Sequence, residues 1–227
     1  MSLLTFHPVQ VKICGLTTLE DALHAAASGA NYLGFILYPP SPRAISPTSL
    51  KPIIQQIRAT LSTPPRLVGV FVNETATIVA QRLDELGLDL AQLHGDEVPW
   101  MVGSPNSPLF GRCYKALRPT SLAEAEAEAE WYLPPDWLED RPALLMDAYH
   151  PTLQGGTGVT ADWAIMAQVA QTVPGLLLAG GLTPDNVVEA VRQVRPYGVD
   201  TASGVEARPG VKDRERVERF IAAAKNP

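Results

Sequence analysis

The segment VKICGLTTLEDALHAAASGANYLGFI, residues 11–36, shows the unit from which the whole chain is built. Its two ends, 11–14 and 32–36, are short and largely apolar, which predicts two β-strands. Between them, apolar side chains recur at the i, i+3, i+4, i+7 spacing of a helix face: Leu19, Ala22, Leu23 and Ala26. The segment therefore predicts a strand, a helix and a second strand in succession.

Turn and cap residues mark the ends of the predicted helices. Thr17 and Glu20 have the spacing of a capping box, which satisfies the exposed amides at a helix start. Gly29 lies where that helix would end. Later in the chain, Thr183 followed by Pro184 predicts a cap residue and a proline at the first helical position.

The same alternation continues to the end of the chain. Short apolar runs predict strands at Val11–Cys14, Tyr32–Ile36, Leu67–Val72, Leu90–Leu93, Tyr114–Ala116, Ala143–Asp147, Leu176–Ala179 and Gly198–Thr201. Helical spacing recurs at Ile78, Leu83 and Leu86 and at Val187, Val188, Val191 and Val194. The Ala/Glu-rich stretch 122–131 is interpreted as a solvated helix, and the proline-rich stretches 38–43 and 98–108 as loops.

Eight strand-helix repeats predict an α/β protein with a single eight-stranded parallel (β/α)8 TIM barrel. The 227 residues suit one such domain, which we expect to span residues 1–227. An open doubly wound sheet is the alternative, but no glycine-rich dinucleotide fingerprint follows the first strand.

Composition limits the classes of function. The chain has 18 basic and 24 acidic residues and a net charge of −6, which argues against a nucleic-acid partner. Two cysteines are too few for a disulfide framework, and the N-terminal MSLLTFHP does not resemble a signal peptide, so we expect a cytoplasmic protein. No run reaches the roughly 18 apolar residues of a membrane span. The four histidines show no metal-ligand spacing, so we expect no metal and no membrane partner.

In a β/α barrel the active site lies at the carboxyl ends of the strands. Cys14 ends the first predicted strand and Asp147 ends the sixth, where it interrupts an apolar run. Cys14 could equally be a small buried hydrophobe, and Asp147 could form a structural salt bridge. Facing each other across one pocket, a thiol and a carboxyl would form a base and an acid for proton transfer. Cys113 has no polar neighbours in sequence and is interpreted as structural.

Three further side chains fall near the same ends. Lys12 shares a strand face with Cys14, so it requires an acidic partner, for which Asp200 and Asp89 are the candidates. Arg43 follows the second strand and could grip a substrate carboxylate with two parallel hydrogen bonds, or remain a solvated loop arginine. His94 ends the fourth strand and either lines the pocket or caps a loop.

Glycine-rich segments follow the last three strands. Barrels commonly bind phosphate through backbone amides after strands seven and eight, and glycine permits the close approach that this needs. We therefore expect a phosphate group at the following segments: Gly155-Gly156-Thr157-Gly158, Gly180-Gly181 and Ser203-Gly204.

Several of these motifs together resemble the phosphoribosylanthranilate isomerase family. The resemblance runs in order through VKICG at 11–15, GVFVN at 69–73, QLHG at 92–95, GGTG at 155–158, AGGL at 179–182, SGVE at 203–206 and PGVKD at 209–213. Residues 109–137 match less well, and Met146 and His150 beside the predicted acid depart from the expected pattern. The similarity nevertheless covers nearly the whole chain.

The resemblance implies an isomerase of tryptophan biosynthesis, an aromatic amino acid pathway. The implied reaction is the Amadori rearrangement of N-(5-phosphoribosyl)anthranilate to 1-(2-carboxyphenylamino)-1-deoxyribulose 5-phosphate. It implies that Cys14 is the general base and Asp147 the general acid, and that no cofactor is needed. The substrate-binding residues would be Arg43, on the anthranilate carboxylate, with His94 and Asp200, and the phosphate-binding residues would be Gly156, Gly180, Gly181, Ser203 and Gly204.

This mechanism requires opposite shifts of two pKa values. Desolvation would have to raise the pKa of Asp147, and the positive charge of Lys12 would lower that of Cys14. Two rival functions remain at this point. A related isomerase of histidine biosynthesis generally carries aspartate where this chain has Cys14, and a non-catalytic binder of phosphorylated ligands would not need Cys14 and Asp147 together. The enzyme would act as a monomer or homodimer.

Overall fold

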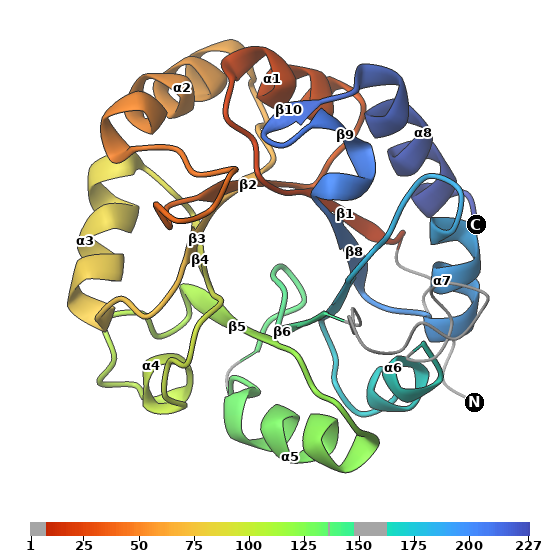
Figure 1. Ribbon diagram of the computed structural model, residues 1–227. Helices are drawn as coiled ribbons and strands as arrows, with labels where there is room; N and C mark the ends of the chain where they lie inside the picture. The colour runs from red at the N-terminus through yellow and green to blue at the C-terminus, as the bar shows by residue number, and fades with distance from the viewer. Residues whose placement is uncertain (1–7, 136, 148–162) are drawn as a thin grey trace.

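The computed structural model describes residues 8–135, 137–147 and 163–227. Eight parallel strands form a closed barrel in which each strand pairs with the next, and the first with the eighth (Figure 1). The strands are β1 (Gln10–Ile13), β2 (Tyr32–Ile36), β3 (Arg66–Phe71), β4 (Leu90–Leu93), β5 (Cys113–Leu117), β6 (Leu144–Asp147), β7 (Leu176–Ala179) and β8 (Gly198–Thr201). The predicted TIM barrel is confirmed, and the open sheet is excluded.

Helices form a ring outside the strands (Figure 1). They are α1 (Leu19–Ala27), α2 (Pro47–Thr60), α3 (Ala76–Leu86), α4 (Trp100–Gly103), α5 (Leu122–Tyr132), α6 (Trp163–Val169), α7 (Val187–Val194) and α8 (Arg214–Lys225). The Ala/Glu-rich stretch forms α5, as predicted. Among the described residues, no helix is long and apolar enough to cross a membrane.

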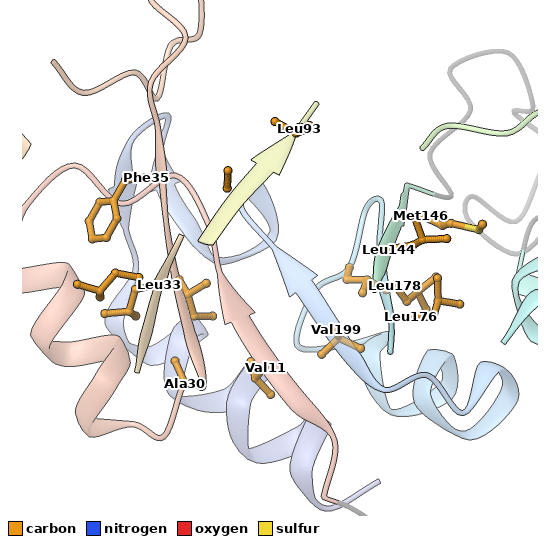
Figure 2. Close-up of a cluster of buried hydrophobic side chains, with 14 of the residues drawn as sticks. Val11, Ala30, Leu33, Phe35, Leu93, Leu144, Met146, Leu176, Leu178 and Val199 are labelled. Carbon is orange, nitrogen blue, oxygen red and sulfur yellow. The ribbon is translucent and has the colours of Figure 1, made fainter. Parts of the chain in front are cut away.

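Strand alternation divides the hydrophobic core into two layers. Outward-facing side chains such as Val11, Leu33 and Val199 pack between the strands and the helices (Figure 2). Inward-facing side chains, with Tyr32, Tyr114 and Leu177 among them, fill the barrel interior. Because both faces of each strand are buried, the strand sequences are largely apolar along their whole length, which is typical of parallel sheets.

The predicted strands agree closely with the observed ones. Four of them, β2, β4, β7 and β8, have the predicted bounds; β6 differs by one residue at its start, and β1, β3 and β5 differ by one residue at each end. Val98–Pro108 was expected to be a loop throughout, but it contains the short helix α4. A hairpin of two short antiparallel strands, β9 (Glu206–Arg208) and β10 (Val211–Lys212), was not predicted.

Both predicted helix starts are wrong, the first by one residue and the second by three. The cap of α1 is Thr18, whose hydroxyl accepts a hydrogen bond from the Asp21 amide, and not Thr17. The Thr17 hydroxyl instead donates to the Gly210 carbonyl in the β9–β10 hairpin.

The helix α7 begins after Asn186, beyond the predicted Thr183 and Pro184. The Thr183 amide donates to the Asn186 side chain at 2.8 Å, which closes a separate turn before the helix.

Candidate active site

The carboxyl ends of the eight strands lie at one end of the barrel, and Cys14 directly follows β1 there. Its backbone amide donates to the Thr201 carbonyl of β8 at 2.8 Å, and its thiol is buried. A Cβ atom on Gly34 of β2 would lie 2.8 Å from the Cys14 Sγ and 3.1 Å from the Lys12 Nζ. The glycine in β2 therefore provides the room that these two side chains occupy.

Lys12 forms a buried ion pair with Asp200, and not with Asp89. The Lys12 Nζ donates to the Asp200 Oδ1 at 2.7 Å, while Asp89 pairs with Arg58 on the surface. Burial alone would lower the pKa of Lys12, but the charge of Asp200, the smaller effects of Cys14 and Tyr114, and the hydrogen bond to Asp200 together raise it. Lys12 is therefore a fixed positive charge inside the barrel.

The Cys14 thiol has a raised pKa, contrary to the expected decrease. Burial is the largest cause, because it disfavours the thiolate. Lys12 lowers the pKa, as expected, and Lys212 adds a smaller effect of the same sign, but they do not outweigh burial and the negative charge of Asp200. The cations around Cys14 therefore reduce the desolvation penalty of the thiolate without removing it.

Arg43 lies beside Cys14 and is already engaged on one side. Its stem packs over Gly15, which has a φ of +72° and whose Cβ, if present, would lie 2.8 Å from the Arg43 Cδ. Its Nε and Nη2 donate to the Glu206 carboxylate at 2.8–3.1 Å, and Glu206 also accepts from the Lys212 Nζ at 3.0 Å. Arg43 is thus not a solvated loop arginine.

His94 lies in a polar chain that starts inside the barrel. The Tyr114 hydroxyl and the Gln92 amide are 3.0 Å apart, and the amide lies 2.7 Å from the His94 Nδ1. The Arg118 Nη2 lies 2.8 Å from the His94 Nε2. Among the described residues, His94 borders a cavity of about 500 Å³ together with Asn73 and Arg118, and neither Cys14 nor Asp147 lines that cavity. A role of His94 in lining the active-site pocket stays a prediction.

The protonation state of His94 follows from its partners. A guanidinium can only donate hydrogen bonds, so the Nε2 facing Arg118 accepts and the proton resides on Nδ1. The structure places the Gln92 Nε2 against that nitrogen, so the amide has to be flipped for its oxygen to accept the Nδ1 proton and its nitrogen to face the Tyr114 hydroxyl. Burial, followed by the positive charges of Arg118, Lys12 and Lys115, lowers the pKa of His94 to about 3. His94 is therefore a neutral acceptor that orients Arg118.

Asp147 ends β6, and its side chain is partly exposed. The Asp147 Oδ2 lies 3.8 Å from the Arg118 Nε, so the polar chain reaches this carboxyl group. Met146 lies on the opposite, outward face of β6, in the layer beneath the helices (Figure 2). It therefore does not line the same pocket as Asp147. His150 lies outside the described residues.

The expected phosphate loops after β7 and β8 lie against each other. The Thr201 hydroxyl donates to the Leu182 carbonyl at 2.8 Å, and a side chain on Gly204 would collide with that same carbonyl. Gly180 and Gly181 both have positive φ angles, 98° and 65°, which suit glycine. Ser203 is exposed in the short 3-10 helix after β8. Gly156 lies outside the described residues.

Four polar residues of this site were not singled out from the sequence. Glu206 and Lys212 occur in the SGVE and PGVKD motifs, but nothing local indicated that they would meet Arg43. Gln92 and Arg118 flank the expected His94 in space, and Gln92 shares its strand face. Among the residues that the structure describes, no group of three His, Cys, Asp or Glu side chains could hold a metal ion.

The fold and these residues define an enzyme of the β/α-barrel class with a thiol and a carboxyl group at the strand ends. Residues 11–223 match the family described as N-(5'-phosphoribosyl)anthranilate (PRA) isomerase. A relative from Geobacter sp. (strain M21), named N-(5'-phosphoribosyl)anthranilate isomerase, is 44% identical over 218 residues, which are 95% of this chain and 98% of the relative. The chain belongs to this family of isomerases.

Solved structures agree with this assignment. Monomers generated from the dimeric phosphoribosylanthranilate isomerase of Thermotoga maritima match with a TM-score of 0.77 and 33% identity, over 96% of this chain and 100% of that one. A phosphoribosyl anthranilate isomerase in complex with reduced 1-(o-carboxyphenylamino)-1-deoxyribulose 5-phosphate matches with a TM-score of 0.76 and 34% identity, with the same coverage.

Proposed function

We propose that this chain converts N-(5'-phosphoribosyl)anthranilate into 1-(2-carboxyphenylamino)-1-deoxyribulose 5-phosphate, an Amadori rearrangement in tryptophan biosynthesis. Family membership over residues 11–223 supports the reaction. The observation that carries the residue roles is the position of Cys14 at the end of β1, beside the Lys12–Asp200 pair, with Asp147 at the end of β6.

Two proton transfers account for the rearrangement. Asp147, protonated, donates to the ribose ring oxygen as the C1–O bond breaks, and the anilino nitrogen lone pair forms an iminium at C1. The Cys14 thiolate then removes the proton from C2, and the electrons of that bond neutralise the iminium to give an enol-amine. Tautomerisation of the enol-amine yields the ketone. The iminium is itself the electron acceptor, so the reaction needs no cofactor.

The remaining residues have binding roles in this proposal. Arg43 contacts the anthranilate carboxylate, and Asp200 lies near the substrate amine. His94 contributes to substrate binding by orienting Arg118, because His94 is neutral and already accepts a hydrogen bond from the Arg118 guanidinium. The phosphate is held by the backbone at Gly156, Gly180, Gly181, Ser203 and Gly204. Positive φ angles at Gly180 and Gly181 and the packing of Gly204 on Leu182 support a backbone site there.

The same proposal places the enzyme in the cytoplasm, as a homodimer or a monomer. Neither Cys14 nor Cys113 forms a disulfide, which suits the reducing cytoplasm. The similarity to a dimeric relative supports a homodimer, with a monomer as the alternative.

Turnover of freshly made phosphoribosylanthranilate, followed by loss of its fluorescence, tests the proposal. We expect wild-type turnover and a decrease of at least about 100-fold in kcat for Cys14→Ser and for Asp147→Asn, which is typical of losing a general base or acid. Cys113→Ser and Asp140→Asn are matched controls, since Cys113 faces outward and Asp140 lies beside Arg66 near the other end of the barrel. Binding of the substrate without wild-type turnover would instead favour the non-catalytic binder.

A further inference from the structure

Arg43, Glu206 and Lys212 form a compact cluster of charges beside Cys14. Glu206 lies at its centre, on β9 directly after the 3-10 helix that follows β8, and accepts from Arg43 on one side and from Lys212 on the other. The Gly210 amide donates to the same carboxylate at 3.2 Å. The side chains of Glu206 and Lys212 are only 4% and 1% exposed. Removing one partner of an ion pair this deeply buried is costly, because it leaves an uncompensated charge in the interior.

The contacts fix which edge of the Arg43 guanidinium is available. A guanidinium has five N–H donors in a rigid plane, arranged as a side edge (Nε and Nη2) and an end edge (Nη1 and Nη2). Glu206 occupies the side edge with three contacts of 2.8–3.1 Å. Within the described part of the chain, Nη1 has no hydrogen-bond partner, so the end edge can receive a second carboxylate in the bidentate geometry.

The charges of the cluster favour an anion at that edge. Arg43 and Glu206 alone would form a neutral pair with little attraction for a second carboxylate. Lys212, held in place by the Ala202 carbonyl at 2.9 Å, contributes another positive charge. Two cations and one carboxylate leave one net positive charge, which is the complement of a single carboxylate on the ligand.

We propose that Glu206 and Lys212 are positioning residues that make Arg43 selective for a carboxylated aromatic ring. Glu206 fixes the orientation of the guanidinium, and Lys212 supplies the surplus positive charge. The proposal rests on the proposed function, because it takes the anthranilate carboxylate as the partner of Arg43. It goes further by assigning the selectivity to the β9–β10 hairpin and not to Arg43 alone.

Calorimetric binding of two ligands tests the proposal without requiring turnover. One ligand is reduced 1-(o-carboxyphenylamino)-1-deoxyribulose 5-phosphate, and the other is the same compound without the carboxyl group. The ratio of their Kd values measures the carboxylate selectivity. Because both ligands carry the same phosphate and sugar chain, an effect on the phosphate loops or on Cys14 cancels in this ratio.

Three variants separate charge from orientation. For Lys212→Met we expect the selectivity to fall at least about tenfold, as for one partner of a buried charge pair, while Lys212→Arg retains it. For Glu206→Gln, added positive charge alone would increase selectivity, whereas loss of orientation decreases it. We expect a decrease. Arg216→Met is the control, since the polar partners of the Arg216 side chain among the described residues are the Glu206 backbone carbonyl and Asp213, and the Glu206 carboxylate is not one of them.

The outcomes distinguish the two levels of the proposal. If Lys212→Met and Glu206→Gln weaken both ligands equally, their role is purely structural and the positioning proposal is wrong. A wild-type chain that binds both ligands equally well would also overturn it. A wild-type chain that is selective but does not turn over phosphoribosylanthranilate would refute the proposed function and leave the selectivity assignment standing.

Discussion

Single residues in this barrel take their chemistry from their neighbours, and His94 shows this most clearly. Three cations act on it, and the nearest one, Arg118, requires its Nε2 to accept a hydrogen bond. His94 is therefore neutral near neutral pH and cannot act there as a general acid. Neither the neutral state of His94 nor the raised pKa of Cys14 could be predicted from sequence. Both follow from burial and from charged residues that lie far apart along the chain.

The depressed pKa of His94 predicts a pH dependence of stability. An unfolded histidine has a pKa of about 6.5, whereas the folded value is about 3. Between these values only the unfolded state binds the proton, so this contribution is complete above pH 6.5 and is lost as the pH falls towards 3. Urea unfolding at pH 7 and pH 5 should show wild type losing more stability than His94→Gln, by at most about 1.4 kcal/mol per pH unit below 6.5. Parallel losses in the two proteins would contradict the assignment.

At the scale of elements, the loops after β7 and β8 act as one unit. Gly204 packs directly on the Leu182 carbonyl, and Thr201 donates to the same oxygen. The eight strands were predictable because each is a short apolar run buried on both faces. The β9–β10 hairpin was not, because its residues are mostly charged or turn-forming and gain their contacts from distant parts of the chain. Glu206 and Arg43, for example, are 163 positions apart.

A methyl group at Gly204 tests whether this loop contact matters for phosphate binding. Gly204→Ala would push the β8 loop away from Leu182, since the obstacle is backbone and not a flexible side chain. We expect kcat/KM for phosphoribosylanthranilate to fall roughly 10- to 100-fold, as for a displacement of about 1 Å at a binding group. Gly103→Ala is the control, because a Cβ there would meet only Pro135 at 4.0 Å. An unchanged kcat/KM in Gly204→Ala would remove these loops from the phosphate site.

At the scale of the whole molecule, the barrel closes where β1 pairs with β8. These strands come from opposite ends of the chain, and Lys12 lies directly opposite Asp200 in their register. The ion pair between them is buried at this junction, next to the space that Gly34 leaves. Its two charges therefore stabilise each other and, at the same time, set the electrostatic environment of Cys14.

Because Lys12 and Asp200 neutralise each other inside the barrel, we expect their contributions to the free energy of unfolding to be strongly coupled. Lys12→Met leaves Asp200 with an unpaired charge, and Asp200→Asn leaves Lys12 charged and fully buried. We expect each single change to lower the free energy of unfolding by roughly 3–5 kcal/mol. The double variant Lys12→Met/Asp200→Asn should cost less than the sum, because no lone charge remains in the barrel. Urea unfolding of the four proteins measures the coupling. Strictly additive losses would mean that each side chain is stabilised independently, by water or by other groups, and that the pair does not close the barrel.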